Sequence, residues 1–149
     1  MSEIFVDTIR KTGGSLGTDI RIKNTSVYES DGGTSVTQNI VQGLAKHWVR
    51  LDGSGTISAL DSFNNSGVTD HGNGSYTFAF TNNMNNVNYS VQLTASVDHT
   101  VDFFFATIGD ESGSYTPPAT TGYRSHNCGS AGSTGDTDHV CGTVNGDLA

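Results

Sequence analysis

Two short motifs place a histidine two residues before a cysteine, and their side chains are the first candidates for chemistry. The four residues are His126, Cys128, His139 and Cys141. Side chains at positions i and i+2 of a strand share a face, so each motif can present an imidazole and a thiol together. Two His and two Cys suit tetrahedral zinc, although this spacing departs from the common zinc motifs. Metal binding is therefore one alternative, but we expect no metal and no cofactor.

The two cysteines allow two simpler interpretations. If the last two strands form a hairpin, Cys128 and Cys141 face each other across it and could form a disulfide. The short loop would limit the entropic gain to about 3 kcal/mol. Alternatively, both residues are half-buried free thiols in that hairpin.

Hydrolytic chemistry is poorly supported by the arrangement of serines, histidines and acids. The segment Gly53-Ser54-Gly55 indicates a hairpin turn rather than a nucleophile elbow between a strand and a helix. In Asp70-His71 and Asp98-His99 the two side chains are adjacent, so on a strand they point to opposite faces. We therefore expect that the protein is not an enzyme.

Loop acids and tyrosines offer two ways of handling sugars. Glycan cleavage needs a carboxylate pair, and the sequence does not fix the separation of its candidates, which are Asp110, Glu111, Asp136 and Asp138. A carbohydrate-binding surface could instead combine Asn-rich loops with the tyrosines, which are Tyr28, Tyr115 and Tyr123. Solvated loop acids and ordinary strand packing are the alternatives to these two interpretations.

Composition and charge narrow the class of protein. The chain has 149 residues, 19 of them glycine, and a net charge of −8 from 7 basic and 15 acidic residues. Its Gly, Ser, Thr and Asn content favours short strands and turns over helices. Nucleic-acid binding needs clustered Lys and Arg, so we do not expect this protein to bind nucleic acid. We also expect no leader peptide and no membrane insertion, because no apolar run is long enough.

The stretch from Gly43 to Ser96 contains the clearest strand patterns. Tyr76, Phe78 and Phe80 alternate along one strand, after the Gly- and Asn-rich turn 71–74. Trp48 enters from an earlier strand, and Phe63 from an Asn-rich loop. The predicted core consists of Trp48, Phe63, Tyr76, Phe78 and Phe80.

Short alternating segments separated by turns recur through the rest of the chain. Further strands are expected near residues 46–51, 56–60, 89–95, 101–108, 121–128 and 140–144. Seven or eight such strands predict an all-β fold, with a β-sandwich or jelly-roll-like knob over residues 43–149. Phe103-Phe104-Phe105 puts aromatic side chains on both faces, so that strand is either central or covered by a neighbouring subunit.

Residues 1–42 are predicted to form a separate N-terminal arm or hairpin. Two strand patterns there cannot bury their apolar faces alone. Either another copy, a larger assembly or the knob itself must cover the apolar residues, which are Ile4, Val6, Ile9, Ile20 and Ile22.

A set of spaced residues also supports a family resemblance. The patterns are Gly-x-Ala-Lys-x-Trp-Val from Gly43, Leu-Asp-Gly-Ser-Gly-Thr from Leu51, Asp-Ser-Phe-Asn from Asp61, and Val-Thr-Asp-x-Gly-x-Gly-x-Tyr-Thr-Phe from Val68. Together with the ending Val144-Asn-Gly-Asp-Leu-Ala, they resemble a module of tailed-bacteriophage structural proteins, usually tail fibres or other exposed virion parts. The resemblance covers residues 43–149. It implies an all-β, often trimeric virion protein and no catalytic chemistry.

From these features we expect a non-enzymatic virion protein, made in the host cytoplasm. It would be a homotrimeric knob anchored by its arm to other phage proteins of the capsid or tail. Both a tail-fibre-like appendage and a capsid-decorating cement protein fit. One alternative is a carbohydrate-binding module that reads a host-surface glycan at a fibre tip. A lectin-like surface module and a small glycan-cleaving enzyme are the remaining classes.

Overall fold

The computed structural model describes residues 27–29, 37–39, 43–96, 104–110, 112–129 and 132–149. Within these ranges the regular elements are all strands, and the prediction of an all-β protein is confirmed. The strands are β1 (Val27–Glu29), β2 (Thr37–Asn39), β3 (His47–Asp52), β4 (Ser58–Phe63), β5 (Asn65–Gly72), β6 (Ser75–Phe80), β7 (Ser90–Ala95), β8 (Phe104–Ile108), β9 (Gly122–Gly129) and β10 (Val140–Asn145). The five apolar residues predicted for the arm lie outside the described residues, as do Asp98, His99 and Glu111.

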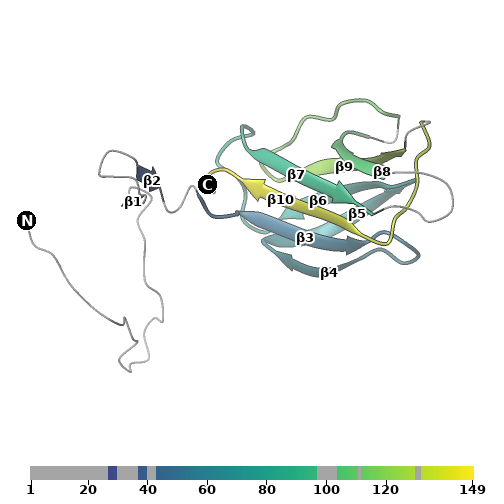
Figure 1. Ribbon diagram of the computed structural model, residues 1–149, viewed down its shortest axis with the longest axis horizontal. Helices are drawn as coiled ribbons and strands as arrows, with labels where there is room; N and C mark the ends of the chain where they lie inside the picture. The colour runs from purple at the N-terminus through teal and green to yellow at the C-terminus, as the bar shows by residue number, and fades with distance from the viewer. Residues whose placement is uncertain (1–26, 30–36, 40–42, 97–103, 111, 130–131) are drawn as a thin grey trace, which may run out of the picture.

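Eight of these strands form two four-stranded antiparallel sheets that pack as a β-sandwich (Figure 1). The front sheet has the order β4-β3-β10-β7, and the back sheet has the order β5-β6-β9-β8. The β-sandwich prediction is therefore confirmed. Strands β1 and β2 pair only with each other in a two-stranded sheet.

Glycine and asparagine form the β5–β6 hairpin where the sequence predicts a turn. Gly72, Asn73 and Gly74 have φ angles of 82°, 50° and 75°. Positive φ is readily adopted by glycine and tolerated by asparagine. This hairpin sets the register in which Phe78 of β6 faces Val68 of β5.

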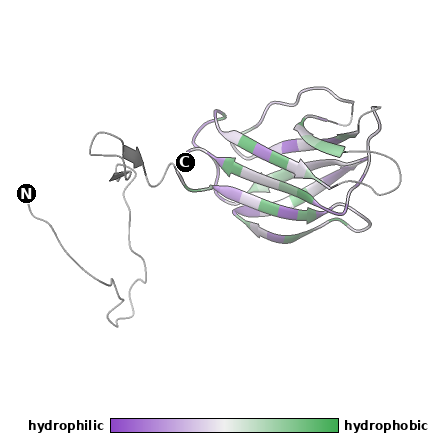
Figure 2. Ribbon diagram, viewed as in Figure 1, coloured by the Kyte–Doolittle hydropathy of each residue, from purple (hydrophilic) through white to green (hydrophobic). Residues whose placement is uncertain are grey.

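Alternation along the strands separates the core from the two outer faces. On β6, Tyr76, Phe78 and Phe80 are buried, as predicted. On β9, Tyr123 is also buried, and it packs against Phe78 with ring centroids 5.2 Å apart. Figure 2 shows the alternation as hydrophilic and hydrophobic bands along the front strands.

The prediction that Trp48 and Phe63 belong to the core is wrong. Both lie on the outer face of the front sheet, where they are register partners and are 37% and 50% exposed. The buried face of β3 instead carries Val49, Leu51 and a histidine, His47. Because side chains alternate along a strand, Trp48 must share the outward face with Arg50, a residue that is exposed.

The last two strands do not form the predicted hairpin. β9 belongs to the back sheet and β10 to the front sheet. Cys128 lies on the outer face of the back sheet beside Phe105, and Cys141 lies on the outer face of the front sheet beside Arg50. Both cysteines are free, so the predicted disulfide alternative is wrong.

Strand β8 lies at the edge of the back sheet, so the first of the two alternatives for this strand, a central position, is wrong. Cover by a neighbouring subunit remains a prediction. Its outward residue Phe105 is 54% exposed. Among the described residues, no helix has the length and apolar character needed to cross a bilayer.

Candidate functional site

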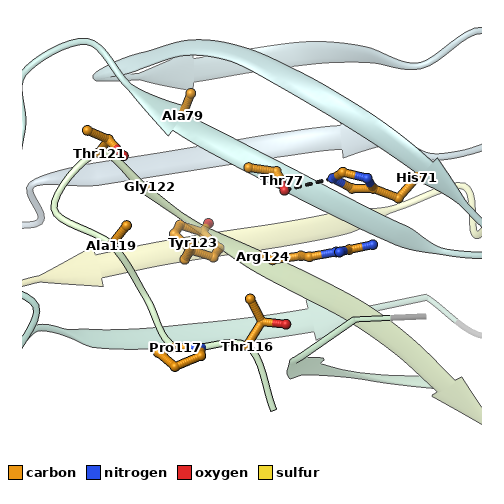
Figure 3. A pocket seen from close by; sticks show the side chains of 10 residues that line it. All are labelled: His71, Thr77, Ala79, Thr116, Pro117, Ala119, Thr121, Gly122, Tyr123 and Arg124. Atoms are coloured by element: carbon orange, nitrogen blue, oxygen red, sulfur yellow. Dashed lines mark hydrogen bonds between the residues drawn. The ribbon is translucent and has the colours of Figure 1, made fainter. Parts of the chain in front are cut away.

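A groove of about 340 Å³ on the outer face of the back sheet is the candidate site (Figure 3). Its floor comes from the central strands β6 and β9, in which Thr77 faces Arg124 and Ala79 faces Gly122. The opposite wall is the segment that contains Thr116 and Pro117. A volume of this size is within the usual range for small-ligand sites.

The groove exists because its floor is made of small residues. A Cβ on Gly122 would collide with the backbone carbonyl of Phe78, so a larger residue cannot occupy this position without moving the backbone. Ala79 is its register partner and also contributes little bulk. This pair leaves a hollow beside the longer side chains of Thr77 and Arg124.

Tyr89 fixes one end of the groove wall. Its hydroxyl oxygen lies 2.8 Å from the carbonyl oxygens of both Ala119 and Gly122. These two residues are also hydrogen bonded to each other through their backbone amides and carbonyls. Burial raises the pKa of Tyr89 to about 12, so the hydroxyl remains a donor at ordinary pH. The amide of Met84 also donates to the carbonyl of Thr120 at 2.9 Å. These bonds hold the 119–122 turn against the sheet.

Asp110 fixes the other end of this wall. Its Oδ1 atom accepts hydrogen bonds from the backbone amides of Ser112 and Ser114 at 3.0 and 2.9 Å, and from the Ser112 hydroxyl at 2.6 Å. The pKa of Asp110 is lowered, chiefly by these bonds and to a smaller extent by the charge of Arg124. The wall is thus held by hydrogen bonds at both ends.

The polar side chains in the groove are already oriented by neighbours. His71 Nε2 is hydrogen bonded to Thr77 Oγ1 at 2.9 Å, as the dashed line in Figure 3 marks. Arg124 Nε donates to Ser75 Oγ at 3.0 Å. The groove therefore presents an imidazole, a guanidinium and hydroxyls, while Pro117 and Ala79 supply apolar surface.

The outer face of the front sheet has a different character. Trp48 and Phe63 are register partners on neighbouring strands, and both are exposed. We call these two residues the apolar patch. Arg50 and Asp61 face each other in the same sheet, and Arg50 Nη2 lies 3.3 Å from His139 Nδ1. Neither the groove on the back sheet nor the hollow beside Cys128 and Gly132 includes residues of this face.

The core contains a histidine that sequence reasoning did not single out. His47 is fully buried, with its ring 5.1 Å from that of Phe80 and 5.6 Å from that of Tyr123. Its Nε2 atom lies 3.4 Å from the side-chain amide of Asn65. Burial lowers the pKa of His47 more than the contact with Asn65 raises it. The neutral imidazole is therefore the form that this core accepts.

The predicted metal ligands are not brought together. His126 and Cys128 lie on the outer side of the back sheet, whereas His139 and Cys141 lie on the outer side of the front sheet. The whole sandwich separates the two pairs. Within the described ranges, no three His, Cys, Asp or Glu side chains are grouped as a metal site.

Two of the predicted acids have structural roles. Asp136 Oδ1 accepts hydrogen bonds from the Tyr76 hydroxyl and the Gly74 amide, both at 2.8 Å. Asp110 holds the groove wall. Tyr123 is buried, so its predicted place in a carbohydrate-binding surface is wrong, whereas Tyr115 is 70% exposed next to Thr116 of the groove.

The groove itself was not predicted from the sequence. The alternating strand pattern indicates that Thr77 and Arg124 point outward, but it does not indicate that β6 and β9 are neighbours.

The chain was compared with protein-family models, curated proteins and solved structures, and none of them matches.

Proposed function

We propose that this protein is a non-enzymatic structural component of a phage virion. It would be a homotrimer of surface-exposed β-sandwich knobs, anchored by the N-terminal arm to other capsid or tail proteins. The observation that carries the proposal is the apolar patch on the front sheet, because exposed aromatic side chains do not stabilise an isolated monomer in water. The sequence patterns shared with phage virion modules supply the setting.

The patch has the properties of a contact between copies. Exposed aromatic residues are enriched in protein interfaces, and clustered apolar surface on a small protein marks a site of association. Trp48 and Phe63 lie at the end of the front sheet at which residues 43–46 lead into β3. Copies held together through their arms would therefore meet at this end of the sandwich. A second copy of the chain is the partner we assign to the patch.

Sedimentation of the purified full chain tests the assembly. We expect a mass of three times the 15.6 kDa of one chain. A variant combining Trp48→Ser and Phe63→Ser should sediment as a smaller species. Phe105→Ser is the matched control, since Phe105 is an equally exposed aromatic residue on the opposite sheet. A wild-type monomer at micromolar concentration, or a trimer in the double variant, would contradict the proposal.

Particle incorporation tests the anchor and the location. Deleting residues 1–33 should abolish attachment to particles and leave a sandwich with an unchanged circular-dichroism spectrum. Electron microscopy of labelled particles would place the protein on the head or on the tail. Incorporation of the truncated chain at the wild-type level would refute the anchoring role of the arm.

A further inference from the structure

We propose that residues 18–23 of the N-terminal arm add as a fifth strand to the front sheet of their own chain, along its β7 edge. These residues lie outside the described part of the chain, whereas the edge that would receive them lies within it (Figure 1). Pairing within one chain does not require the association of copies proposed above. Residues 1–17 would remain for the anchoring role.

The two sides of the sandwich protect their edge strands differently. On one side, bulges interrupt the pairing of β4 and of β5, and these strands carry Asp61 and Asp70. Bulges and charged residues are common means by which proteins stop an edge from pairing with another strand. On the other side, β7 pairs with β10 without a bulge and contains neither a charged residue nor a proline. The β7 edge is therefore suited to the addition of a strand.

The core is incompletely covered on the β7 side. Val140 and Val144 of the central strand β10 are fully buried. Their register partners on β7, Ala95 and Val91, are only half-buried, and so is Leu93. An added strand with apolar residues at alternate positions would cover the remaining apolar surface, and such burial is favourable.

The backbone of β7 directs donors and acceptors at this edge. The amide of Ser96 donates to the carbonyl of His139, on the β10 side, at 2.8 Å. Successive residues of an antiparallel strand point their backbone groups alternately to the two sides. Val91, Leu93 and Ala95 therefore direct their amides and carbonyls away from β10. Strand addition uses such groups for affinity and the alternate side chains for specificity.

The pattern of residues 18–23 is complementary to this edge. Ile20 and Ile22 alternate with charged residues. In an antiparallel pairing, these two isoleucines can lie opposite Leu93 and Val91 and extend the core. The charged residues then point outward, beside the exposed serine, glutamine and threonine of β7. They also place charge on the new edge, which supplies the protection that β7 lacks.

The chain can reach this edge from its entry into β3. Strands β3 and β7 both pair antiparallel with β10, so they start at the same pole. An antiparallel strand on β7 would end at that pole, three strand spacings or about 14 Å from β3. The β1–β2 pairing returns the linker to its start. The residues on either side of that hairpin, 24–26 and 40–46, can extend to about 30 Å.

Strand β8, at the edge of the back sheet, also lacks charges and bulges but has the wrong direction. It runs opposite to β7, so an antiparallel strand added there would end at the far pole. The direction of the chain therefore favours β7.

Disulfide trapping in the full chain tests the pairing. With the isoleucines matched as above, Arg21 lies opposite Gln92 on the outer face, in the pair type whose side chains are closest. In a Cys128→Ser/Cys141→Ser background, Arg21→Cys with Gln92→Cys should form an intrachain disulfide on air oxidation, detected by intact mass and peptide mapping. Arg21→Cys with Asp61→Cys, at the opposite edge of the same sheet, is the matched control and should remain unlinked.

Hydrogen exchange gives a second readout, because a six-residue strand in a chain of 149 changes a circular-dichroism spectrum too little. The amides of Val91 and Leu93 should be protected in the full chain. Ile20→Asp should remove that protection, since it would place a carboxylate in the core. Val6→Asp, elsewhere in the arm, is the control and should leave both amides protected.

Each other outcome overturns the inference. A disulfide between two chains would assign the edge to a neighbouring copy. Equal linkage in the control pair would mean that the arm only reaches both edges. Protection retained in Ile20→Asp would give the edge another occupant, and fast exchange in the wild type would remove the added strand. A trimer without the intrachain disulfide would overturn this pairing alone, whereas a monomer with it would refute only the proposed assembly.

Discussion

The two sheets of this sandwich share a core but present opposite outer faces. The front sheet exposes two aromatic residues, Trp48 and Phe63, beside the point where the chain enters β3. The back sheet exposes a hollow floored by Ala79 and Gly122 and walled by a tethered loop. The difference depends on side-chain size at equivalent outward positions. Large residues make a surface suited to another protein, and small residues make a cavity suited to a small molecule.

Among substitutions on the two outer faces, the largest expected effect is that of Gly122→Ala on the back sheet. The new Cβ would meet the carbonyl of Phe78, which cannot move without shifting β6, so the free energy of unfolding should fall by about 3 kcal/mol. Urea-induced unfolding measures the change. Gly67→Ala in the same sheet is the control, because nothing lies within 4 Å of its added Cβ. Equal losses in the two variants would show that the floor is not crowded in this way.

Acid should destabilise the core that both faces share. Since burial lowers the pKa of His47 in the folded protein, the unfolded chain takes up a proton first as pH falls below about 6.5. This contribution to stability is complete above that pH and is lost as pH falls through and below it. Unfolding curves at pH 7.5 and 5 measure the loss.

His47→Leu should remove the loss between pH 7.5 and 5, while His139→Gln, at an exposed histidine, should keep it. The lowered pKa values of Asp52 and Asp110 act in a lower window, where stability is lost as pH falls below about 4. The two windows can therefore be separated. A wild-type loss unchanged by His47→Leu would assign the effect to another group.

Tyr89→Phe should loosen the back face alone. It removes the hydroxyl that bonds to Ala119 and Gly122, at a cost of about 1 kcal/mol. Hydrogen exchange should accelerate at the Ala119 and Gly122 amides and remain unchanged in β3 and β10. Acceleration of similar size in both sheets would mean that Tyr89 supports the whole sandwich rather than the groove wall.

Phe63→Thr should have the smallest effect on folding. Phe63 is half exposed on an outer face, so its replacement by a strand-forming residue should change the free energy of unfolding by no more than about 0.5 kcal/mol. Phe78→Ala, in the core, should cost about 3–5 kcal/mol by the same thermal or urea measurement. A large loss in Phe63→Thr that is independent of protein concentration would mean that the patch stabilises the single chain.

Alternation along the chain was sufficient to predict the class of fold and most of the strands, but β5 was not among them, and Phe63, expected in a loop, ends β4. Tyr76, Phe78 and Phe80 were assigned to the core correctly because alternate positions share a face. Trp48 was misassigned because its size was given more weight than its position. Trp48 lies next to Val49 and two residues before Arg50, so the alternation of side chains along the strand places it on the outer face with Arg50.

Contacts between strands distant in sequence could not be predicted in this way. The groove depends on β6 lying beside β9 with Ala79 opposite Gly122. The separation of Cys128 from Cys141 depends on β9 and β10 joining different sheets. Both facts follow from how the sheets assemble, and local periodicity carries no information about that. The sequence shows that Thr77, Arg124 and His71 are polar. It does not show that they lie together in one groove.

The antiparallel pairing of β3 and β10 places Val144 beside His47. The closing segment is tied to the same end, because the amide of Ala149 donates to the carbonyl of Asn83 at 2.9 Å. The segment that leads into β3 and the segment that follows β10 therefore lie at the same pole of the sandwich. A peptide inserted at Ser54, in the exposed turn at the opposite pole, would be displayed away from the segment that leads into β3. A fluorophore coupled to Ala149 would instead report on the pole at which residues 43–46 lead into β3.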